Sequence, residues 1–291
     1  MSNMPLHQQQ LEFMSALARH RVDFLNPFFD FLGYFDSPYF FYVLVPAIWL
    51  GFSYQWGLRI FYWFSLNTIV NSYLKVWIGW PRPSQDLPEI ALFHPSSGGF
   101  PSGGAQLCMF LGGLLIYYGR TRAARIVGVT YTLLISYSRL YLGVHYPIDI
   151  LGGWVIAWLL LFLFIVVQKP LEKFLIKRGL SFCLLLSLIV PLAIIALAQN
   201  PILTYIMGSL LGAGLGTYCS LKNHLFLPPP KNLMEGFGRA FIGIALVFLI
   251  VLLWPQDLPR VSKSFLASLL MSLAASPISR AIYSPSHSRR Q

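Results

Sequence analysis

The chain has 291 residues, of which 56% are hydrophobic and only 11% are charged. A soluble domain carries about 25% charged residues, so this composition excludes an ordinary soluble protein. Long apolar runs separated by short polar breaks favour an integral membrane protein built as a helical bundle. The formal net charge of +11 is scattered over short loops, which favours a membrane-topology signal over a nucleic-acid-binding surface.

The first part of the chain is amphipathic. Its opening residues, "MSNMPLHQQQLEF", lack a basic region followed by an apolar core, so we expect no cleavable signal peptide. Residues 7–33 mix charged side chains with Phe and Leu, which predicts one or two helices at the membrane interface. We therefore expect residues 1–37 to form an amphipathic interfacial segment.

Nine apolar segments follow, each close to the length that a membrane-crossing helix requires. We expect them near residues 38–54, 58–78, 103–119, 125–142, 148–168, 180–198, 201–220, 238–254 and 263–279. The predicted fold class is all-α: a polytopic membrane helical bundle of about nine transmembrane helices with an N-terminal interfacial helix.

Lys and Arg indicate the orientation of these segments, because they are enriched in cytoplasmic loops. If the N-terminus lies outside and the segments alternate, 14 of the 21 basic residues face the cytoplasm and 7 face outside. This arrangement puts the C-terminus in the cytoplasm. It also puts three polar motifs on the outer face: one after the second segment, one before the third, and one between the fourth and fifth.

The first motif is "KVWIGWPRP", residues 75–83. Lys75 and Arg82 lie about two helical turns apart, and the two prolines end the helix. Two cations near one helix end can converge on an anion. The alternative is that both side chains extend to the interface beside the neighbouring tryptophans, which is common at the ends of membrane spans.

The second motif is "GGFPSGGAQ", residues 98–106, a glycine-rich turn that leads into the third apolar segment. Ser102 and the amides of Gly103 and Gly104 fall at a helix N-terminus, where free N–H groups and the helix dipole attract anions. The alternative is an ordinary serine N-cap after a proline turn.

The third motif is "YSRLYLGVHYPIDILGG", residues 137–153. Arg139 ends the fourth segment, and Pro147 suits the first turn of the fifth. His145 precedes this helix, and Asp149 follows four residues later, close enough to accept a proton from the imidazole and fix its tautomer. The alternative is a capping histidine with an aspartate that the helix dipole favours.

These motifs together supply three cations, a hydroxyl group, backbone donors and a carboxylate-oriented histidine. Cations and amides can hold the equatorial oxygens of a phosphoryl group while the imidazole attacks phosphorus. We therefore predict phosphoryl transfer with no metal ion and no other cofactor. The three cysteines lie in apolar runs and form no disulfide or metal motif: Cys108, Cys183 and Cys219.

The motifs resemble the three signature motifs of the type 2 phosphatidic acid phosphatase (PAP2) superfamily over about residues 38–168. The matching residues, in order, are Lys75, Arg82 and Pro83; Pro101, Ser102 and Gly103; and Ser138, Arg139, His145 and Asp149. The resemblance implies that His145 is the nucleophile that forms a phosphohistidine, oriented by Asp149. It implies that the phosphate is bound by Lys75, Arg82, Ser102, Gly103 and Arg139. The outer N-terminus and the number of spans are similar to the glucose-6-phosphatase and sphingosine-phosphate phosphatase branches, which does not fix the substrate.

Gly104 departs from this family pattern, which usually has a histidine there that protonates the leaving group. One hypothesis is that the substrate is a polyprenyl or similar lipid diphosphate. Its leaving group has a pKa of about 6 and can depart unprotonated, whereas an alkoxide, with a pKa near that of water at about 15.7, cannot. Two alternatives remain: another group such as His94 supplies the proton, or monophosphates are hydrolysed slowly.

We predict an enzyme, a membrane phosphatase that hydrolyses a lipid phosphate or diphosphate at the outer face of a cell membrane. Its partners would be the lipid substrate and the membrane, with no nucleic acid. The alternative is a non-catalytic phospholipid-binding or transport protein that keeps the same pocket. Gly104 favours this alternative, whereas the His145–Asp149 pair favours the enzyme, because binding alone does not need it.

The C-terminal part, residues 180–291, shows no comparable chemistry. We expect it to add transmembrane helices and a basic tail to the PAP2-like catalytic core of residues 38–168. Gly208, Gly212 and Gly216 recur at four-residue spacing, which predicts close helix–helix packing.

Overall fold

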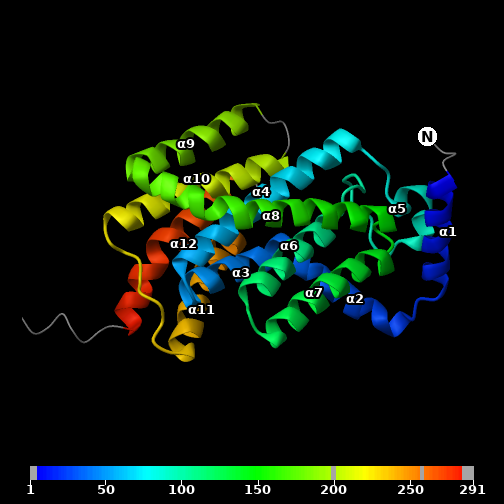
Figure 1. Ribbon diagram of the computed structural model, residues 1–291, viewed down its shortest axis with the longest axis horizontal. Helices are drawn as coiled ribbons and strands as arrows, with labels where there is room; N and C mark the ends of the chain where they lie inside the picture. The colour runs from blue at the N-terminus through cyan, green and yellow to red at the C-terminus, as the bar shows by residue number, and fades with distance from the viewer. Residues whose placement is uncertain (1–4, 198–200, 256–258, 284–291) are drawn as a thin grey trace, which may run out of the picture. The chain divides into compact units, whose positions relative to one another are not determined.

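The computed structural model describes residues 5–197, 201–255 and 259–283, and the regular structure in these ranges is helical (Figure 1). The longer helices are α1 (Pro5–Arg19), α2 (Asn26–Leu32), α3 (Pro38–Gly51), α4 (Tyr54–Ile78), α6 (Gly103–Tyr118), α7 (Arg122–Tyr141), α8 (Pro147–Arg178), α9 (Leu180–Leu197), α10 (Pro201–Lys222), α11 (Leu233–Leu253) and α12 (Arg260–Tyr283). Short turns of helix are η1 (Asp23–Leu25), η2 (Gly33–Asp36), α5 (Pro83–Asp86) and η3 (Pro88–Ile90). The all-α prediction is confirmed for these residues.

The nine predicted apolar segments coincide with α3, α4 and α6–α12. The ends differ most in α8, which continues to Arg178, because neither Pro170 nor the basic residues around it stop the helix. The chain turns at Gly179, whose φ of +85° favours a residue without a side chain. Arg289 and Arg290 of the predicted basic tail, and the C-terminus itself, lie outside the described residues.

Four of the described helices, α8, α9, α10 and α11, are long and apolar enough to cross a membrane. The chain is therefore a membrane protein with several apolar helices. α4 and α7 are also long, but polar side chains along them, such as Asn67, Asn71 and Thr132, lower their apolar character. The count of nine membrane spans stays a prediction.

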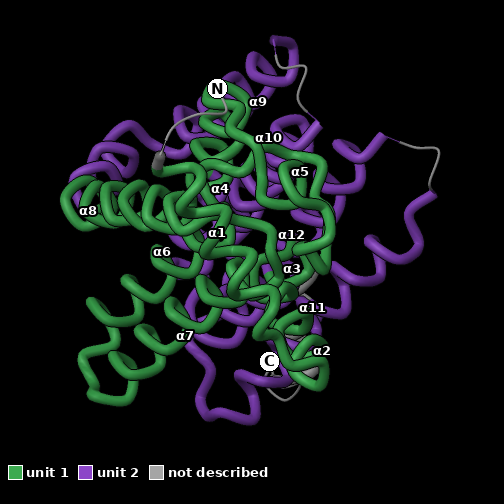
Figure 2. The backbone as a smooth tube through the Cα atoms, turned by 90° about the vertical axis from the view of Figure 1, so that its right-hand side faces the viewer, with its two compact units in different colours: residues 1–40, 66–168 green, residues 41–65, 169–291 purple. Residues whose placement is uncertain are grey.

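The chain forms two compact units, coloured separately in Figure 2. Unit 1 consists of residues 1–40 and 66–168, and unit 2 of residues 41–65 and 169–291. All three polar motifs belong to unit 1.

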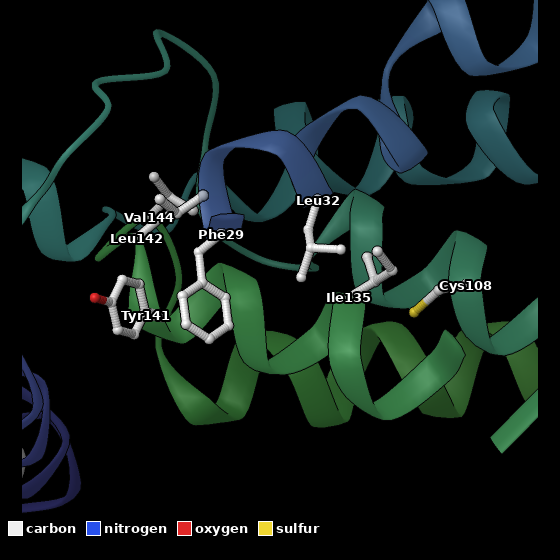
Figure 3. Packing of buried hydrophobic residues seen from close by; sticks show 7 residues of the cluster. All are labelled: Phe29, Leu32, Cys108, Ile135, Tyr141, Leu142 and Val144. Carbon is white, nitrogen blue, oxygen red and sulfur yellow. The ribbon is translucent and has the colours of Figure 1, made fainter. Parts of the chain in front are cut away.

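Unit 1 is centred on α6 and α7, which pack side by side, with α2 and η2 against them. A cluster of buried side chains joins these elements, namely Phe29, Leu32, Cys108, Ile135, Tyr141, Leu142 and Val144 (Figure 3). The Phe29 ring stacks on Tyr141 with 3.9 Å between ring centroids. The N-terminal segment, predicted to be interfacial, thus contributes buried side chains to the core of unit 1.

The first helix, α1, also packs onto unit 1, against α7 and η3. Its Met14 side chain is fully buried with Ile90 and Tyr146. The Gln10 side chain accepts a hydrogen bond from the Ile148 amide at 2.9 Å, which satisfies one of the free N–H groups at the start of α8. α1 therefore supports the turn that carries the third motif.

That turn depends on Gly143. Its φ of +72° lies in the left-handed region, and a side chain there would also collide with the Ile90 carbonyl. α7 ends at Tyr141, two residues after Arg139, and the left-handed Gly143 turns the chain. Pro147 begins α8 four residues after Gly143. The turn between the two helices carries His145.

Unit 2 is held by close helix packing and by ion pairs, among them Arg59–Glu172 and Arg239–Glu235. A side chain at Gly208, Gly212 or Gly216 of α10 would overlap α12, so the four-residue glycine spacing serves close approach, as predicted. In the same unit, Arg59 donates two hydrogen bonds to the Glu172 carboxylate, at 2.8 and 2.9 Å.

Phe29→Ala should destabilise unit 1, because it removes a stacked ring from a closed cluster. Large-to-small changes of a buried Phe cost about 3–5 kcal/mol, so the melting temperature of the detergent-solubilised protein should fall by several degrees. Phe24, which is 78% exposed in the same segment, provides the control, and Phe24→Ala should leave the melting temperature nearly unchanged. Equal melting temperatures for the two variants would contradict this packing.

Candidate active site

The three polar motifs meet within unit 1 around the loop of residues 97–99. The Lys75 ammonium at the end of α4 donates to the carbonyl oxygens of Gly98 at 2.7 Å and Gly99 at 3.2 Å. The Gly99 amide in turn donates to the Trp80 carbonyl at 2.8 Å. The loop therefore connects the first motif to the second.

Arg82 lies at the centre of the site and is only 4% exposed, so it does not extend to the interface. Its Nε donates to the Ser97 carbonyl at 2.7 Å, and one Nη atom donates to the Val144 carbonyl at 2.8 Å. The same Nη atom lies 3.1 Å from Nε2 of His145. This guanidinium therefore joins the first motif to the third.

The contact with Arg82 assigns the tautomer of His145. A guanidinium only donates hydrogen bonds, so Nε2 must accept and carries the free electron pair. The proton then resides on Nδ1, which lies 3.2 Å from the Asp149 carboxylate. The carboxylate therefore lies beside the ring nitrogen that carries the proton.

Asp149 is itself fixed at the start of α8. Its carboxylate accepts the Tyr146 amide at 2.9 Å, so an acidic side chain in the first turn satisfies a free N–H group. Its backbone carbonyl accepts the Ser102 amide at 3.0 Å, which ties the second motif to the third. Both members of the His145–Asp149 pair are therefore buried and held by backbone contacts.

Ser102 and Gly103 lie at the N-terminus of α6. Ser102 is the N-cap, with its Oγ 3.4 Å from the Ala105 amide, and it is fully buried. The Asn71 side chain donates to the Pro101 carbonyl at 3.2 Å and to the Gln106 side chain at 2.8 Å. This network fixes the turn before α6 and orients its free amides.

Arg139 lies at the end of α7, where its Nε and one Nη atom donate to Ser138 Oγ at 3.1 and 3.0 Å. Its other Nη atom forms an ion pair with the Asp36 carboxylate at 3.2 Å. Asp36 ends η2, in the N-terminal segment. It brings an additional carboxylate to the cations of the three motifs.

The electrostatics favour a neutral imidazole. Burial, together with the positive charges of Arg82, Lys75 and Arg139, lowers the pKa of His145 well below its usual value. Burial also lowers the pKa of Arg82, to about 10, which leaves the guanidinium charged at neutral pH. The site therefore combines a neutral nitrogen nucleophile with fixed positive charge.

Several residues of the site were not predicted from the sequence. Asn71 and Asn67 lie about one and two turns before Lys75 on the same face of α4, and this four-residue spacing could have identified them. Asp36 has a weaker signal, a lone acid between aromatic residues. His94, considered as a substitute proton donor, is exposed.

Across residues 5–197, 201–255 and 259–283, no group of three or more His, Cys, Asp and Glu side chains lies close enough to hold a metal ion. The described cysteines are free thiols, and Cys108 is buried against α7.

Comparison with known proteins assigns the family. Residues 56–173 match the family model described as the PAP2 superfamily. The lipid A 4'-phosphatase of Bacteroides thetaiotaomicron is 30% identical over 178 residues, which cover 53% of this chain and 79% of that protein. The chain belongs to the PAP2 superfamily. It is therefore a phosphoric ester hydrolase, as the three motifs predicted.

Two other relatives have different substrates in their names. The undecaprenyl-diphosphatase of Sulfolobus acidocaldarius is 25% identical over 169 residues, or 56% of this chain and 81% of that protein. The sphingosine-1-phosphate phosphatase 1 of Mus musculus is 25% identical over 268 residues, covering 83% of this chain and 61% of that protein. The PAP2 match extends over all three motifs, whereas α9–α12 lie beyond it.

The pKa of His145 should respond to an anion. We expect the free protein to show a His145 titration below 6.5, the usual value for histidine, because burial and three cations disfavour the imidazolium. Inorganic phosphate should raise this pKa, because its negative charge offsets the cations. Side-chain NMR of the ¹⁵N-histidine-labelled protein measures both values, with His145→Ala identifying the signal. A free-state pKa at or above 6.5 would contradict the buried neutral ring.

Proposed function

We propose that this PAP2 protein hydrolyses a lipid phosphate or lipid diphosphate through a phosphohistidine intermediate on His145, without a metal ion. The observation that carries the proposal is the position of His145 between Arg82 and Asp149. Nε2 presents a free electron pair beside the guanidinium, and Nδ1 presents its proton to the carboxylate.

In the proposed reaction, Nε2 of His145 attacks phosphorus and the ester bond breaks. The imidazole gains positive charge as the P–N bond forms, and the carboxylate of Asp149 stabilises it through Nδ1–H. Water then attacks the phosphohistidine, which releases inorganic phosphate and returns the electron pair to Nε2. Nε2 of His145 is therefore the atom that bonds to phosphorus in the first step and is released from it in the second.

The phosphate would be bound by Lys75, Arg82, Ser102, Gly103 and Arg139. The charged side chains have donors already directed by neighbouring oxygens, so little reorganisation is needed when charge develops on the equatorial oxygens. Ser102 and the Gly103 amide add neutral donors at the N-terminus of α6. Three positive charges supply the stabilisation that a divalent metal provides in other phosphoryl-transfer sites.

A lipid substrate fits a site carried by a protein with membrane-crossing helices. The relatives named as lipid A 4'-phosphatase, undecaprenyl-diphosphatase and sphingosine-1-phosphate phosphatase support this substrate class. They also differ in the group that leaves, which is an alkoxide or a phosphate. We therefore keep both mono- and diphosphate lipids as substrates.

The non-catalytic alternative, a phospholipid-binding or transport protein, rests on Gly104. It predicts binding of the lipid phosphate with no release of inorganic phosphate. Phosphate release by the purified protein from a panel of lipid mono- and diphosphates, without added metal, separates the two functions.

We further propose that the site faces outward from the cell membrane, that about nine helices span it, and that the C-terminus is cytoplasmic. The support is the distribution of 14 inner and 7 outer basic residues. The three motifs then share the outer face.

His145→Ala should abolish phosphate release, because no other group supplies the nucleophilic nitrogen. Asp149→Asn should lower kcat by about 10⁴, the cost of losing the correct tautomer in a serine-protease triad. Rapid quenching with ³²P-labelled substrate should trap an acid-labile phosphoenzyme in the wild type and none in His145→Ala. Glu89→Gln, which changes an exposed carboxylate in η3, provides the control and should retain wild-type activity. Ordinary turnover by His145→Ala would exclude the mechanism.

The orientation can be tested in intact cells. A reporter fused after Gln291 should behave as cytoplasmic, and a cysteine introduced at Ser96, an exposed position next to the loop of residues 97–99, should react with a membrane-impermeant maleimide. The native cysteines are replaced first to give an unreactive background. A periplasmic or extracellular reporter signal would mean either that the site faces the cytoplasm or that the predicted number of spans is wrong by an odd number.

A further inference from the structure

The space beside Gly104 is filled by a carboxylate. A Cβ atom at residue 104 would overlap the Asp36 carboxylate and lie 3.3 Å from Cδ of Arg139. Asp36 therefore occupies the volume that a side chain at position 104 would need. The family pattern that the three motifs resemble usually has, at this same position, a histidine that protonates the leaving group.

Asp36 is held there by the packing of the N-terminal segment. η2 lies against α6 and α7, and Tyr131 of α7 donates its hydroxyl to the Phe35 carbonyl at 3.2 Å. Phe29 and Leu32 of the preceding helix are buried in the cluster of Figure 3. The side chain of Asp36 is only 18% exposed and pairs with Arg139, a proposed phosphate ligand.

The reaction itself requires a proton donor when the leaving group is an alkoxide, whose conjugate acid has a pKa of about 15.7. In the proposed mechanism, Lys75, Arg82 and Arg139 hold the phosphate, while His145 and Asp149 form the nucleophilic pair. Asp36, which pairs with Arg139, is an ionisable group to which this mechanism gives no role.

We propose that Asp36 is the general acid of this enzyme, which protonates the leaving oxygen of a lipid monophosphate and then serves as the general base for water. This inference rests on the proposed function. It assigns alkyl monophosphates as substrates despite Gly104, in place of a restriction to diphosphates.

Nε2 of His145 donates its electron pair to phosphorus, the bridging P–O bond breaks, and the departing oxygen takes its electron pair and the proton of the Asp36 carboxyl group. The products are the lipid alcohol, phosphohistidine and the Asp36 carboxylate. This carboxylate then accepts a proton from the attacking water, the P–N bond breaks, and inorganic phosphate leaves with the acid form of Asp36 restored.

Charge balance explains how Asp36 acquires its proton. Burial raises the pKa of Asp36, whereas the positive charges of Arg139, Arg82 and Lys75 lower it. A phosphate monoester brings a charge of about −1.5 to −2 to these same cations. The anion thereby weakens the stabilisation of the Asp36 carboxylate, and proton uptake by Asp36 accompanies substrate binding.

A purely structural role for Asp36 makes a different prediction. If Asp36 only held Arg139 in place, its loss would weaken phosphate binding to a similar extent for every substrate. A general acid matters most when the leaving group is basic, and it contributes about 10²–10⁴ in rate. The leaving-group dependence of the defect therefore separates the two roles.

The first experiment compares Asp36→Asn with the wild type on phosphatidate and on a polyprenyl diphosphate. Asparagine keeps an oxygen that can accept from Arg139 but cannot donate a carboxyl proton. We expect kcat on phosphatidate to fall by about 10²–10⁴ and kcat on the diphosphate to fall less than about tenfold, since its leaving group has a pKa of about 6. Asp30→Asn, at an exposed carboxylate of the same segment, is the matched control and should behave as wild type.

The second experiment moves the proposed acid from residue 36 to residue 104. It also keeps the proposal testable if a single variant misfolds. Gly104→His alone should lose activity, because the new side chain overlaps Asp36. The double variant Asp36→Ala/Gly104→His has room for the imidazole, and should hydrolyse phosphatidate at least tenfold faster than Asp36→Ala/Gly104→Ala. The two double variants differ only in the presence of an acid at residue 104.

The outcomes distinguish this inference from the proposed function. Equal losses of Asp36→Asn on both substrates, a wild type that hydrolyses only the diphosphate, or double variants of equal activity would overturn the role of Asp36 and leave the phosphatase in place. A wild type that releases phosphate from neither lipid would overturn the proposed function itself.

Discussion

The enclosure of three cations around one neutral histidine is the constraint on which the rest of unit 1 depends. Lys75, Arg82 and Arg139 repel one another, and burial removes the water that would screen them. Protein oxygens compensate: carbonyl groups from residues 97–99 and from Val144, the Ser138 hydroxyl, and the carboxylates of Asp36 and Asp149. These contacts also fix the direction of each donor.

This compensation explains why the second motif is rich in glycine. The loop must bring carbonyl oxygens close to Lys75 and Arg82, and a side chain at Gly99 would press against the Pro81 carbonyl and the Asp149 carboxylate. At residue 99, glycine lets the backbone approach these groups closely. The same requirement applies at Gly104, where the space is used by a carboxylate from another part of the chain.

The sequence predicted the helices and the three motifs, because both depend on local spacing. Apolar length defined the nine helical segments, and the four-residue separation of His145 and Asp149 predicted their contact. It did not predict Asp36, which lies 103 residues from Arg139 along the chain. Nor did it predict the loop carbonyls that bind Lys75, because any residue has a carbonyl group.

The membrane-spanning helices were harder to identify from the sequence, again because of polar residues that belong to the site. α4 and α7 carry the polar side chains that build the site, so the residues needed for chemistry also reduce the apolar character of these helices. Asn67, Asn71 and Gln106 hydrogen-bond to one another inside unit 1. The Gln106 side chain bonds to both asparagines, so much of their polarity is satisfied within the protein, although Nδ2 of Asn67 has no partner among the described residues.

The choice of a carboxylate beside Arg139 has a consequence that a histidine there would not have. An imidazolium at this position would add positive charge to a site that already encloses three cations. A carboxylate offsets part of that positive charge in the free protein. When bound phosphate neutralises the cations instead, the carboxylate can take up a proton and act as an acid. One side chain can thus stabilise the free site and donate a proton in the loaded one. The N-terminal segment that delivers it is therefore part of the catalytic unit, and its packing through Phe29 and Leu32 links the stability of unit 1 to the chemistry.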